Sequence, residues 1–173
     1  MSGTDLRVRL TDLRRHPGDR LVVAGPVDID GLAVTTAAVA GSTGDVDLVI
    51  ESLSDGVTVT GTVGFRWIGS CRRCLDETSG SGSADISEVF KDHPDDEQLL
   101  AIAGDTVDLT PVIREAVLLA LPLAPLCRDD CAGPDPDHFP VTTADDDGEA
   151  PTDPRWAALA ELEFDTDRTE SES

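Results

Sequence analysis

Two pairs of cysteines are the residues of this chain with the clearest potential for chemistry. The chain has 4 cysteines, arranged as C-x2-C and then C-x3-C. Two closely spaced pairs that meet in space supply four thiolates, the ligand set that binds Zn²⁺ tetrahedrally in structural sites. Because the protein would then fill every coordination position, such a zinc would be structural rather than catalytic. The predicted ligands are Cys71, Cys74, Cys127 and Cys131, with His138 as a reserve ligand.

Three other interpretations of the cysteines remain open. Structural disulfides need an oxidising compartment, whereas the first residues, MSGTDLRVRL, contain no apolar signal segment and predict a cytoplasmic protein. A redox C-x-x-C normally begins a helix in a βαβ unit, which the pattern does not show, although Arg72 and Arg73 would lower the thiol pKa values. The third interpretation is four unconnected buried cysteines. We favour zinc because all four cysteines are paired at short spacing.

Charge is the second strong feature of the chain. Asp and Glu number 35 against 13 Lys and Arg, which gives a formal net charge of −22. This field repels phosphate backbones and anionic lipids and attracts basic partners. We therefore expect a basic protein partner and no membrane contact, with direct RNA contact limited to a local basic spot at Arg66, Arg72 and Arg73. A simpler alternative is that the acidic surface only maintains solubility.

Alternation of apolar and polar residues predicts several β-strands. These cover residues 6–10, 32–40, 45–53, 57–69 and 84–90. In the clearest strand, 57–69, valines and aromatic residues occupy odd positions and threonines and an arginine occupy even ones. Two glycines within it, Gly61 and Gly64, indicate a bulge or a bend. The return of the chain through 84–90 places the first cysteine pair near the tip of a hairpin.

Residues 109–121 show the apolar spacing of one helical face. Asp108 or Thr110 can cap the N-terminus of this helix, Pro111 is tolerated in its first turn, and Pro122 ends it. Together with the strands, this pattern predicts an α+β fold. It would be a mostly antiparallel β domain with one well-defined helix and a zinc-knuckle-like cluster of four cysteines.

Composition divides the chain into four regions. Residues 1–131 would form the β-rich metal-binding domain, and residues 132–153 an acidic, proline-rich linker. Residues 154–164 would form a short C-terminal helix, and residues 165–173 a disordered tail.

Sequence motifs for enzymatic chemistry are scarce. The chain has no glycine-rich phosphate loop, no nucleophile elbow and no HExxH motif. We therefore expect a protein that is not an enzyme. A C-x-x-C thiol oxidoreductase and a zinc-knuckle protein that contacts RNA remain the alternative functions.

Four segments, in their order along the chain, resemble the YceD family. They are LRVRLTDLRRHPG, VTVTGTVGFRWIGSCRRCL, DLTPVIREAVLLALPLAPLCRDDCAG and DPRWAAL. The resemblance implies a metal-binding, non-enzymatic factor of bacterial ribosome biogenesis that supports accumulation of 23S ribosomal RNA. Combined with the acidic surface, it makes a basic ribosomal protein or the pre-ribosomal large subunit the expected partner.

One segment departs from the family pattern. Some members continue beyond the position of Cys131 into a further pair of cysteines, where this chain has PDPDHFP. If those members build their metal site within the C-terminal segment alone, Cys71 and Cys74 would not belong to the site. Members with fewer cysteines favour an arrangement that uses both pairs of this chain.

Overall fold

The computed structural model describes residues 6–92 and 100–139, all within the first of two units of the chain, Met1–Pro140. The second unit, Val141–Ser173, lies outside the described residues, as does most of the predicted linker. The predicted C-terminal helix and tail therefore stay predictions.

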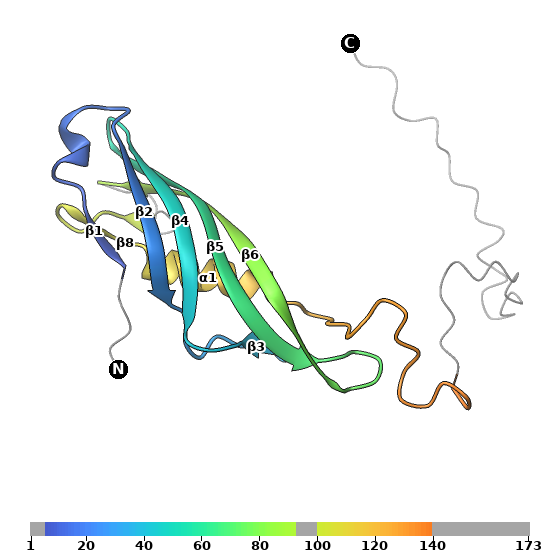
Figure 1. Ribbon diagram of the computed structural model, residues 1–173. Helices are drawn as coiled ribbons and strands as arrows, with labels where there is room; N and C mark the ends of the chain where they lie inside the picture. Colours follow the sequence, from blue (N-terminus) through green and yellow to red (C-terminus); the bar gives the residue numbers. More distant parts are fainter. Residues whose placement is uncertain (1–5, 93–99, 140–173) are drawn as a thin grey trace, which may run out of the picture. The chain divides into compact units, whose positions relative to one another are not determined.

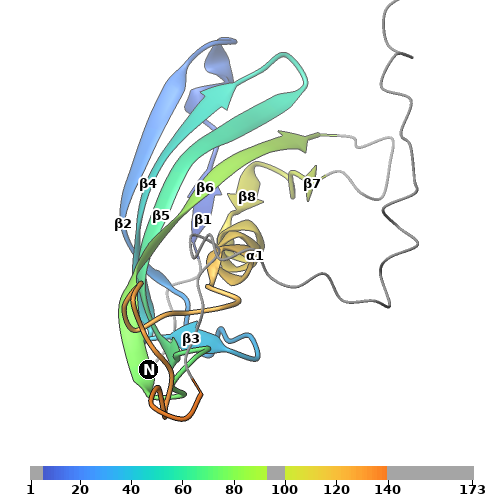
Figure 2. The ribbon, with the colours of Figure 1, turned by 90° about the vertical axis from the view of Figure 1, so that its right-hand side faces the viewer.

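A curved, six-stranded sheet is the main element of the described chain (Figures 1 and 2). Its strands run in the order β2-β4-β5-β6-β7, and β3 pairs with the end of β5. All pairs are antiparallel except β6–β7, and a separate two-stranded sheet joins β1 to β8. The strands are β1 Arg7–Arg9, β2 Arg20–Asp28, β3 Ala37–Val39, β4 Thr43–Ser52, β5 Gly56–Ser70, β6 Glu77–Lys91, β7 Leu100–Ala101 and β8 Thr106–Asp108, with a 3₁₀ turn, η1, at Leu13–Arg15.

A long hairpin of β5 and β6 forms the centre of the sheet. Each strand has 15 residues, and they pair without a break over their whole length. Of the two features expected at Gly61 and Gly64, a bulge or a bend, the bulge is wrong, because β5 pairs with β4 and with β6 without an inserted residue. Gly61 is required for another reason. Its φ is +146°, and a Cβ there would lie 2.1 Å from the backbone oxygen of Asp47 on β4.

The predicted alternation of faces is confirmed in β5. Threonines at even positions of β5 point outward, while the valines at odd positions are buried. The buried face of the sheet is its concave face, which the helix α1 covers (Figure 2). The core side chains of these three elements are Val46, Leu48 and Ile50 on β4, Val57, Val59, Val63 and Phe65 on β5, and Val112, Ile113 and Val117 on α1.

The predicted helix is confirmed as α1, Thr110–Ala120, with a proline in its first turn. Its N-cap residue is Leu109 rather than Asp108 or Thr110, and no side chain caps it. The two predicted capping groups are used otherwise. The Thr110 hydroxyl accepts the N–H of Leu6, which ties the helix start to the residue before β1. The Asp108 carboxylate accepts the N–H of Thr110, the first residue of the helix. Within the described residues, no helix has the length and apolar character needed to cross a membrane.

Five strands differ from the sequence prediction, and two of them, the short strands β7 and β8, lie where the pattern predicts no strand. The pattern does not predict β2, because its valine-rich run is interrupted by Gly25 and Pro26 and lacks clean alternation. The predicted strand at 32–40 shortens to β3, because the residues before it form a turn in which Val34 bonds to Ala37. β6 begins at Glu77 rather than at 84, because a serine–glycine repeat carries no apolar alternation.

Candidate metal centre

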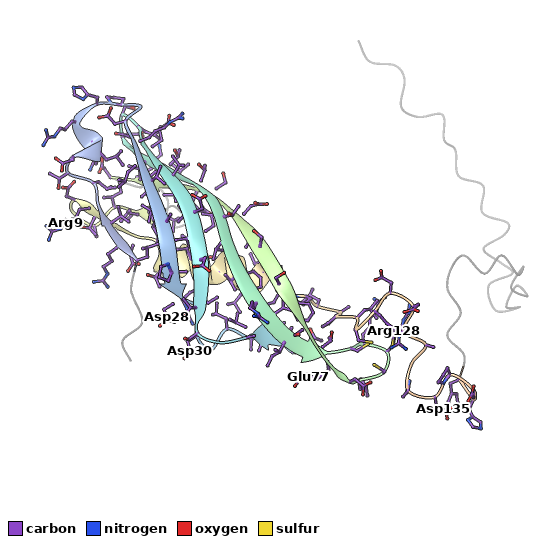
Figure 3. All side chains as sticks on the ribbon, viewed as in Figure 1. Arg9, Asp28, Asp30, Glu77, Arg128 and Asp135 are labelled. Carbon is purple, nitrogen blue, oxygen red and sulfur yellow. The ribbon has the colours of Figure 1, made fainter. Side chains whose placement is uncertain are left out.

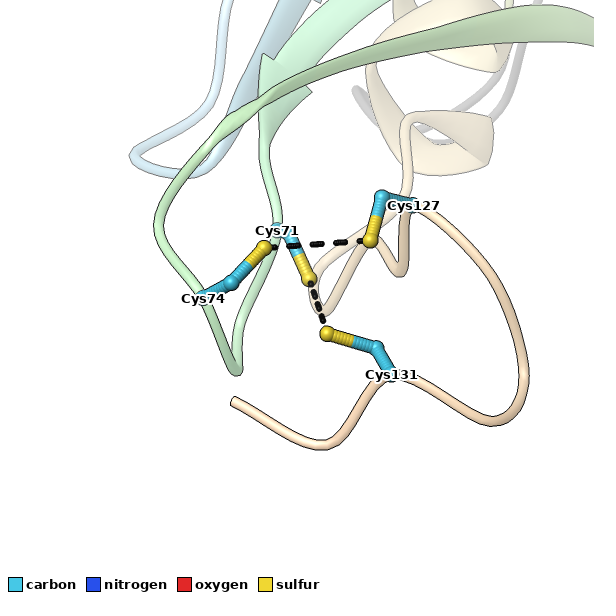
Figure 4. Close-up of side chains that lie close together, drawn as sticks. All are labelled: Cys71, Cys74, Cys127 and Cys131. Atoms are coloured by element: carbon cyan, nitrogen blue, oxygen red, sulfur yellow. Dashed lines mark hydrogen bonds between the residues drawn. The ribbon is translucent and has the colours of Figure 1, made fainter. Parts of the chain in front are cut away.

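The first cysteine pair lies in the tight loop between β5 and β6. The N–H of Cys71 donates to the carbonyl oxygen of Asp76 at 2.8 Å, and the N–H of Leu75 donates to that of Cys71 at 3.0 Å. Leu75 has a φ of +65°, a left-handed conformation that costs a residue with a side chain about 1–2 kcal/mol. The chain therefore reverses sharply just after Cys74, so that both thiols of the loop face the second pair (Figure 4).

The second cysteine pair lies on the segment that follows α1. Two carbonyl groups anchor this segment to the rest of the protein. The oxygen of Pro122 accepts the Thr36 hydroxyl at 3.0 Å, and the oxygen of Pro125 accepts the N–H of Arg72 at 2.8 Å. The segment is thereby held beside the hairpin loop before Cys127 begins the second pair.

A turn and a guanidinium group complete the connection between the two segments. The N–H of Cys131 donates to the carbonyl of Arg128 at 3.1 Å. Nη1 of Arg73 donates to the carbonyls of Asp129 at 3.1 Å and Cys131 at 2.7 Å. Arg128 and Glu77, the first residue of β6, accordingly lie at the same end of the sheet (Figure 3). Arg73 therefore joins the first cysteine loop to the backbone of the second.

The four sulfur atoms converge on one point. Sγ of Cys71 lies 3.8 Å from that of Cys131, Sγ of Cys74 lies 3.7 Å from that of Cys127, and all four lie within 4.8 Å of one another (Figure 4). A tetrahedron of thiolates with Zn–S bonds of about 2.3 Å has edges of about 3.8 Å. Donor type and spacing therefore fit a single tetrahedral ion. Across residues 6–92 and 100–139, no other group of metal-ligating side chains of this size is present.

The surroundings of the sulfurs favour the thiolate form of Cys71 and oppose that of Cys74 and Cys127. Backbone N–H groups, chiefly those of Cys74 and Cys127, hydrogen-bond to the sulfur of Cys71 and lower the pKa of this thiol to about 5. The N–H of Asp76 lowers the pKa of Cys74, but burial and the three neighbouring thiols outweigh it and raise the pKa to about 12. Desolvation and the thiols of Cys131 and Cys71 outweigh the hydrogen bond with Cys74 and raise the pKa of Cys127. Four thiolates at this spacing need a cation to offset their repulsion, and a divalent metal ion supplies it.

The geometry of the cluster argues against the three other interpretations of the cysteines. All four thiols are free, and the short sulfur–sulfur distances join one cysteine of each pair rather than the two members of the C-x-x-C. Cys71 and Cys74 lie in a hairpin loop rather than at the start of a helix, which is where a redox C-x-x-C normally lies. The clustering also argues against four unconnected buried cysteines.

The other candidate residues lie beside the cluster or apart from it. Arg66 is exposed on the outer face of β5, and Arg72 is exposed in the cysteine loop, whereas Arg73 is half-buried between the two segments. His138 is exposed, with Nδ1 3.0 Å from the carboxylate of Asp135, and it is not part of the sulfur cluster.

Three residues that support the centre are not predicted from the sequence: Thr36, Asp76 and Pro125. Asp76 and Pro125 act through their main-chain carbonyls, and Thr36 acts from a turn far away in the sequence. Side-chain chemistry gives no signal for such contacts. The one hint is the proline pair in LPLAP, which is typical of an extended segment that returns to another element.

Comparison with known proteins identifies the family. A family model described as "Large ribosomal RNA subunit accumulation protein YceD" matches residues 59–163, a span that contains both cysteine pairs. The chain belongs to the YceD family. The resemblance seen in the sequence is thereby confirmed. The family description links YceD proteins to accumulation of large-subunit ribosomal RNA and names no enzymatic activity.

Relatives of this YceD-family chain carry only the description of uncharacterized proteins. One from Mycobacterium tuberculosis is 33% identical over 172 aligned residues, which cover 91% of this chain and 81% of the relative. One from Mycobacterium bovis has the same identity and coverage. The protein YlbN of Bacillus subtilis is 25% identical over 126 residues, 69% of this chain and 71% of YlbN. No solved structure matches the chain.

Proposed function

We propose that Cys71, Cys74, Cys127 and Cys131 hold one structural Zn²⁺. The observation that carries this proposal is the spacing of four free thiols, which agrees with the edges of a zinc–thiolate tetrahedron. An all-sulfur set of this kind favours zinc or iron–sulfur chemistry over magnesium or calcium. Four protein ligands leave no position for a substrate, so the bound ion would stabilise the fold rather than take part in catalysis.

The ion would connect the hairpin tip to the segment that follows α1. At this end of β6 the residues are serines and glycines, which bury little apolar surface. Hydrogen bonds such as those of Arg72 and Arg73 link the two segments, but each contributes only about 1 kcal/mol net. Metal binding to ligands from distant parts of a chain contributes directly to the free energy of folding.

Metal analysis of the purified full-length protein tests this site. The wild-type protein should hold one zinc per chain. Cys127→Ser, which changes the exposed ligand, should lose that zinc to a chelator that the wild-type protein resists. Ser79→Ala, in the same hairpin, is the matched control and should retain the metal. Equal retention of zinc by Cys127→Ser, or no zinc in wild-type protein prepared with zinc and a reductant, would contradict the proposal.

Family membership implies a role in accumulation of large-subunit ribosomal RNA. We infer that this role is non-enzymatic and consists of contacts with a basic ribosomal protein or with the pre-ribosomal large subunit. The support is the formal net charge of −22, which attracts basic proteins and repels bare RNA. Since screening weakens such contacts, association should decline as salt concentration rises.

Cells that lack the protein test this role. The ratio of large-subunit to small-subunit ribosomal RNA should fall and should recover when the wild-type chain is restored. Capture of the tagged protein should retain a basic ribosomal partner after nuclease treatment. An unchanged RNA ratio would contradict the role, and partners that are lost on nuclease treatment would contradict contact through protein.

A zinc-knuckle protein that contacts RNA through Arg66, Arg72 and Arg73 is the second candidate. The exposure of Arg66 and Arg72 favours it. The two main-chain bonds of Arg73 weigh against it, because they occupy a guanidinium group that would otherwise face phosphate. Binding of purified ribosomal RNA fragments with a salt slope of at least about two phosphates would support this candidate. No binding at low salt would exclude it.

A further inference from the structure

The six-stranded sheet has two edges, and the edge at β2 is protected against pairing. Along a strand, the N–H and C=O groups of alternate residues point to the same edge. The carbonyl of Asp19 accepts the N–H of Ser52 at the end of β4, so the even-numbered residues of β2 face outward. One of them is Pro26, which has no N–H, and Gly25 beside it has a φ of +140°. Proline on an edge is a device by which natural sheets prevent further pairing.

The other edge, at β6, is open over most of its length. β7 pairs with only the last two residues of β6, and no other described strand pairs along this side of Glu77–Val89. The N–H of Ile102 donates to the carbonyl of Lys91 at 2.9 Å, so odd-numbered residues of β6 face this edge. The backbone groups of odd residues 79–87 therefore point away from β5, and no proline interrupts them.

A groove lies between this open edge and α1. Its volume is about 140 Å³, and the two elements that bound it lie next to each other (Figure 2). Its lining residues include three acidic ones, Glu88 and Glu115 among them, and no basic one, and Leu119 is 80% exposed. The groove thus combines apolar surface, negative charge and backbone groups that no described strand pairs. The lining residues are Asp85, Ile86, Glu88, Val112, Glu115, Ala116 and Leu119.

We propose that this groove binds an extended, basic segment of a partner protein by strand addition to β6. Main-chain hydrogen bonds to β6 would hold the segment, and its apolar side chains would contact Ala116 and Leu119 of α1. Its lysines or arginines would meet Glu88 and Glu115, and this charge complementarity selects a basic partner. The chain's own residues 140–173 are a poor occupant because they are predominantly acidic.

This inference deepens the proposed function, on which it rests for the nature of the partner, and it does not depend on the zinc. Fluorescence anisotropy with the full-length protein and a labelled peptide of alternating lysine and valine tests it. A peptide with N-methyl groups on alternate residues should bind at least about tenfold more weakly, because it lacks the required donors. A peptide of alternating glutamate and valine should not bind. Equal binding of the N-methylated peptide would overturn strand addition.

Two variants of equal charge locate the binding. Glu88→Lys combined with Glu115→Lys reverses the charge of the groove. Asp45→Lys combined with Asp47→Lys makes the same change in net charge on exposed residues of β4. The groove variant should lose at least about tenfold in peptide affinity, and the β4 variant no more than about threefold. Equal losses of peptide affinity in the two variants would contradict binding at the groove. They would leave the proposed function intact, because a diffuse acidic surface would still attract a basic partner.

Ser87→Pro tests the backbone of β6 itself. Ser87 is exposed, and its N–H faces the open edge, so proline removes this donor without breaking the pairing with β5. Peptide affinity should fall at least about fivefold while the melting temperature changes little. Unchanged affinity would overturn the proposal. If the variant does not fold, the comparison of the plain and N-methylated peptides decides the question with wild-type protein.

Discussion

The helix-covered centre of the sheet and the cysteine end are held together by different interactions. In the centre, apolar side chains of β4, β5 and α1 belong to one buried core, and Leu48, Ile50 and Ile113 are all 0% exposed. Their burial removes apolar surface from water, which is the main stabilising contribution to folding. The cysteine end has two buried sulfurs, an arginine between two loops and hydrogen bonds to main-chain carbonyls.

The pairing of aromatic residues with glycines explains why the two regions differ. On β6, Gly80 and Gly82 lie opposite Trp67 and Phe65 of β5. A Cβ at either glycine would come within 2.7 Å or 2.6 Å of the facing ring, so each ring lies directly on the backbone of β6. These glycines allow the rings to cover the strand, but they contribute no side chains of their own. A region with so few apolar side chains requires coordination or hydrogen bonds to hold its loops.

Removal of the proposed zinc should have the largest effect on stability and should affect the cysteine end more than the centre. Metal binding contributes directly to folding free energy, so a strong chelator should lower the melting temperature by on the order of 10 °C. Hydrogen exchange should show loss of protection in the loop at 71–76 while β4 and α1 remain protected. Equal loss of protection in both regions would show that the metal stabilises the protein as a whole.

A cavity in the helix-covered centre of the sheet should have the second-largest effect on the free energy of unfolding, and it should not affect zinc binding. Ile113→Ala removes a fully buried side chain of α1, which should cost about 2–5 kcal/mol in denaturant unfolding. Leu119→Ala on the same helix is the control, and its 80% exposure predicts a change within about 0.5 kcal/mol. Both variants should retain one zinc per chain. Loss of zinc from Ile113→Ala would show that the core also positions the ligands.

The same contrast explains how much of the fold can be predicted from the sequence. The alternating strand at 57–69 and the helix at 109–121 are predictable because the apolar residues of their buried faces recur at the strand or helix period within each segment. The first half of β6 is not, since serine and glycine give no apolar signal, although pairing with β5 makes it a strand. The helix cap is mispredicted for a related reason: Leu6, distant in sequence, competes for the Thr110 hydroxyl.

The candidate site also contains some residues that the sequence predicts and others that only the tertiary fold reveals. Residue type and spacing are enough to select the four cysteines, because tetrahedral thiolate coordination requires those groups. The position of Thr36 and the main-chain acceptors of Pro122 and Pro125 depend on the tertiary fold, so no local pattern marks them. The groove beside β6 cannot be predicted from a local pattern either, because its acidic residues come from a strand and a helix that lie apart in the sequence.

A hydrogen bond between two loops should have a smaller effect that depends on the metal. Thr36→Val keeps the side-chain shape but removes the hydroxyl that donates to Pro122 at 3.0 Å, which should cost about 1 kcal/mol in denaturant unfolding. In the metal-free protein the cost should shrink, because the segment after α1 would no longer be held in place. Thr60→Val, on an exposed position of β5, is the control. An equal cost with and without metal would show that this contact belongs to the centre.

Loss of the ion pair between Arg7 and Asp108, just before α1, should have the smallest effect on stability, and its pH dependence should identify it. Partial burial raises the pKa of Asp108, but hydrogen bonds from Thr110 and the ion pair with Arg7 outweigh it and hold the pKa below its ordinary value. A carboxylate with a lowered pKa in the folded state stabilises the protein above its unfolded pKa of about 3.9, and this contribution disappears as pH falls through the folded pKa. Because the Asp108 side chain is 38% exposed, Asp108→Asn should cost less than about 1 kcal/mol at neutral pH. The difference in melting temperature from the wild type should close below about pH 3. If the difference in melting temperature between Asp108→Asn and the wild type persists in acid, Asp108 acts through packing rather than charge.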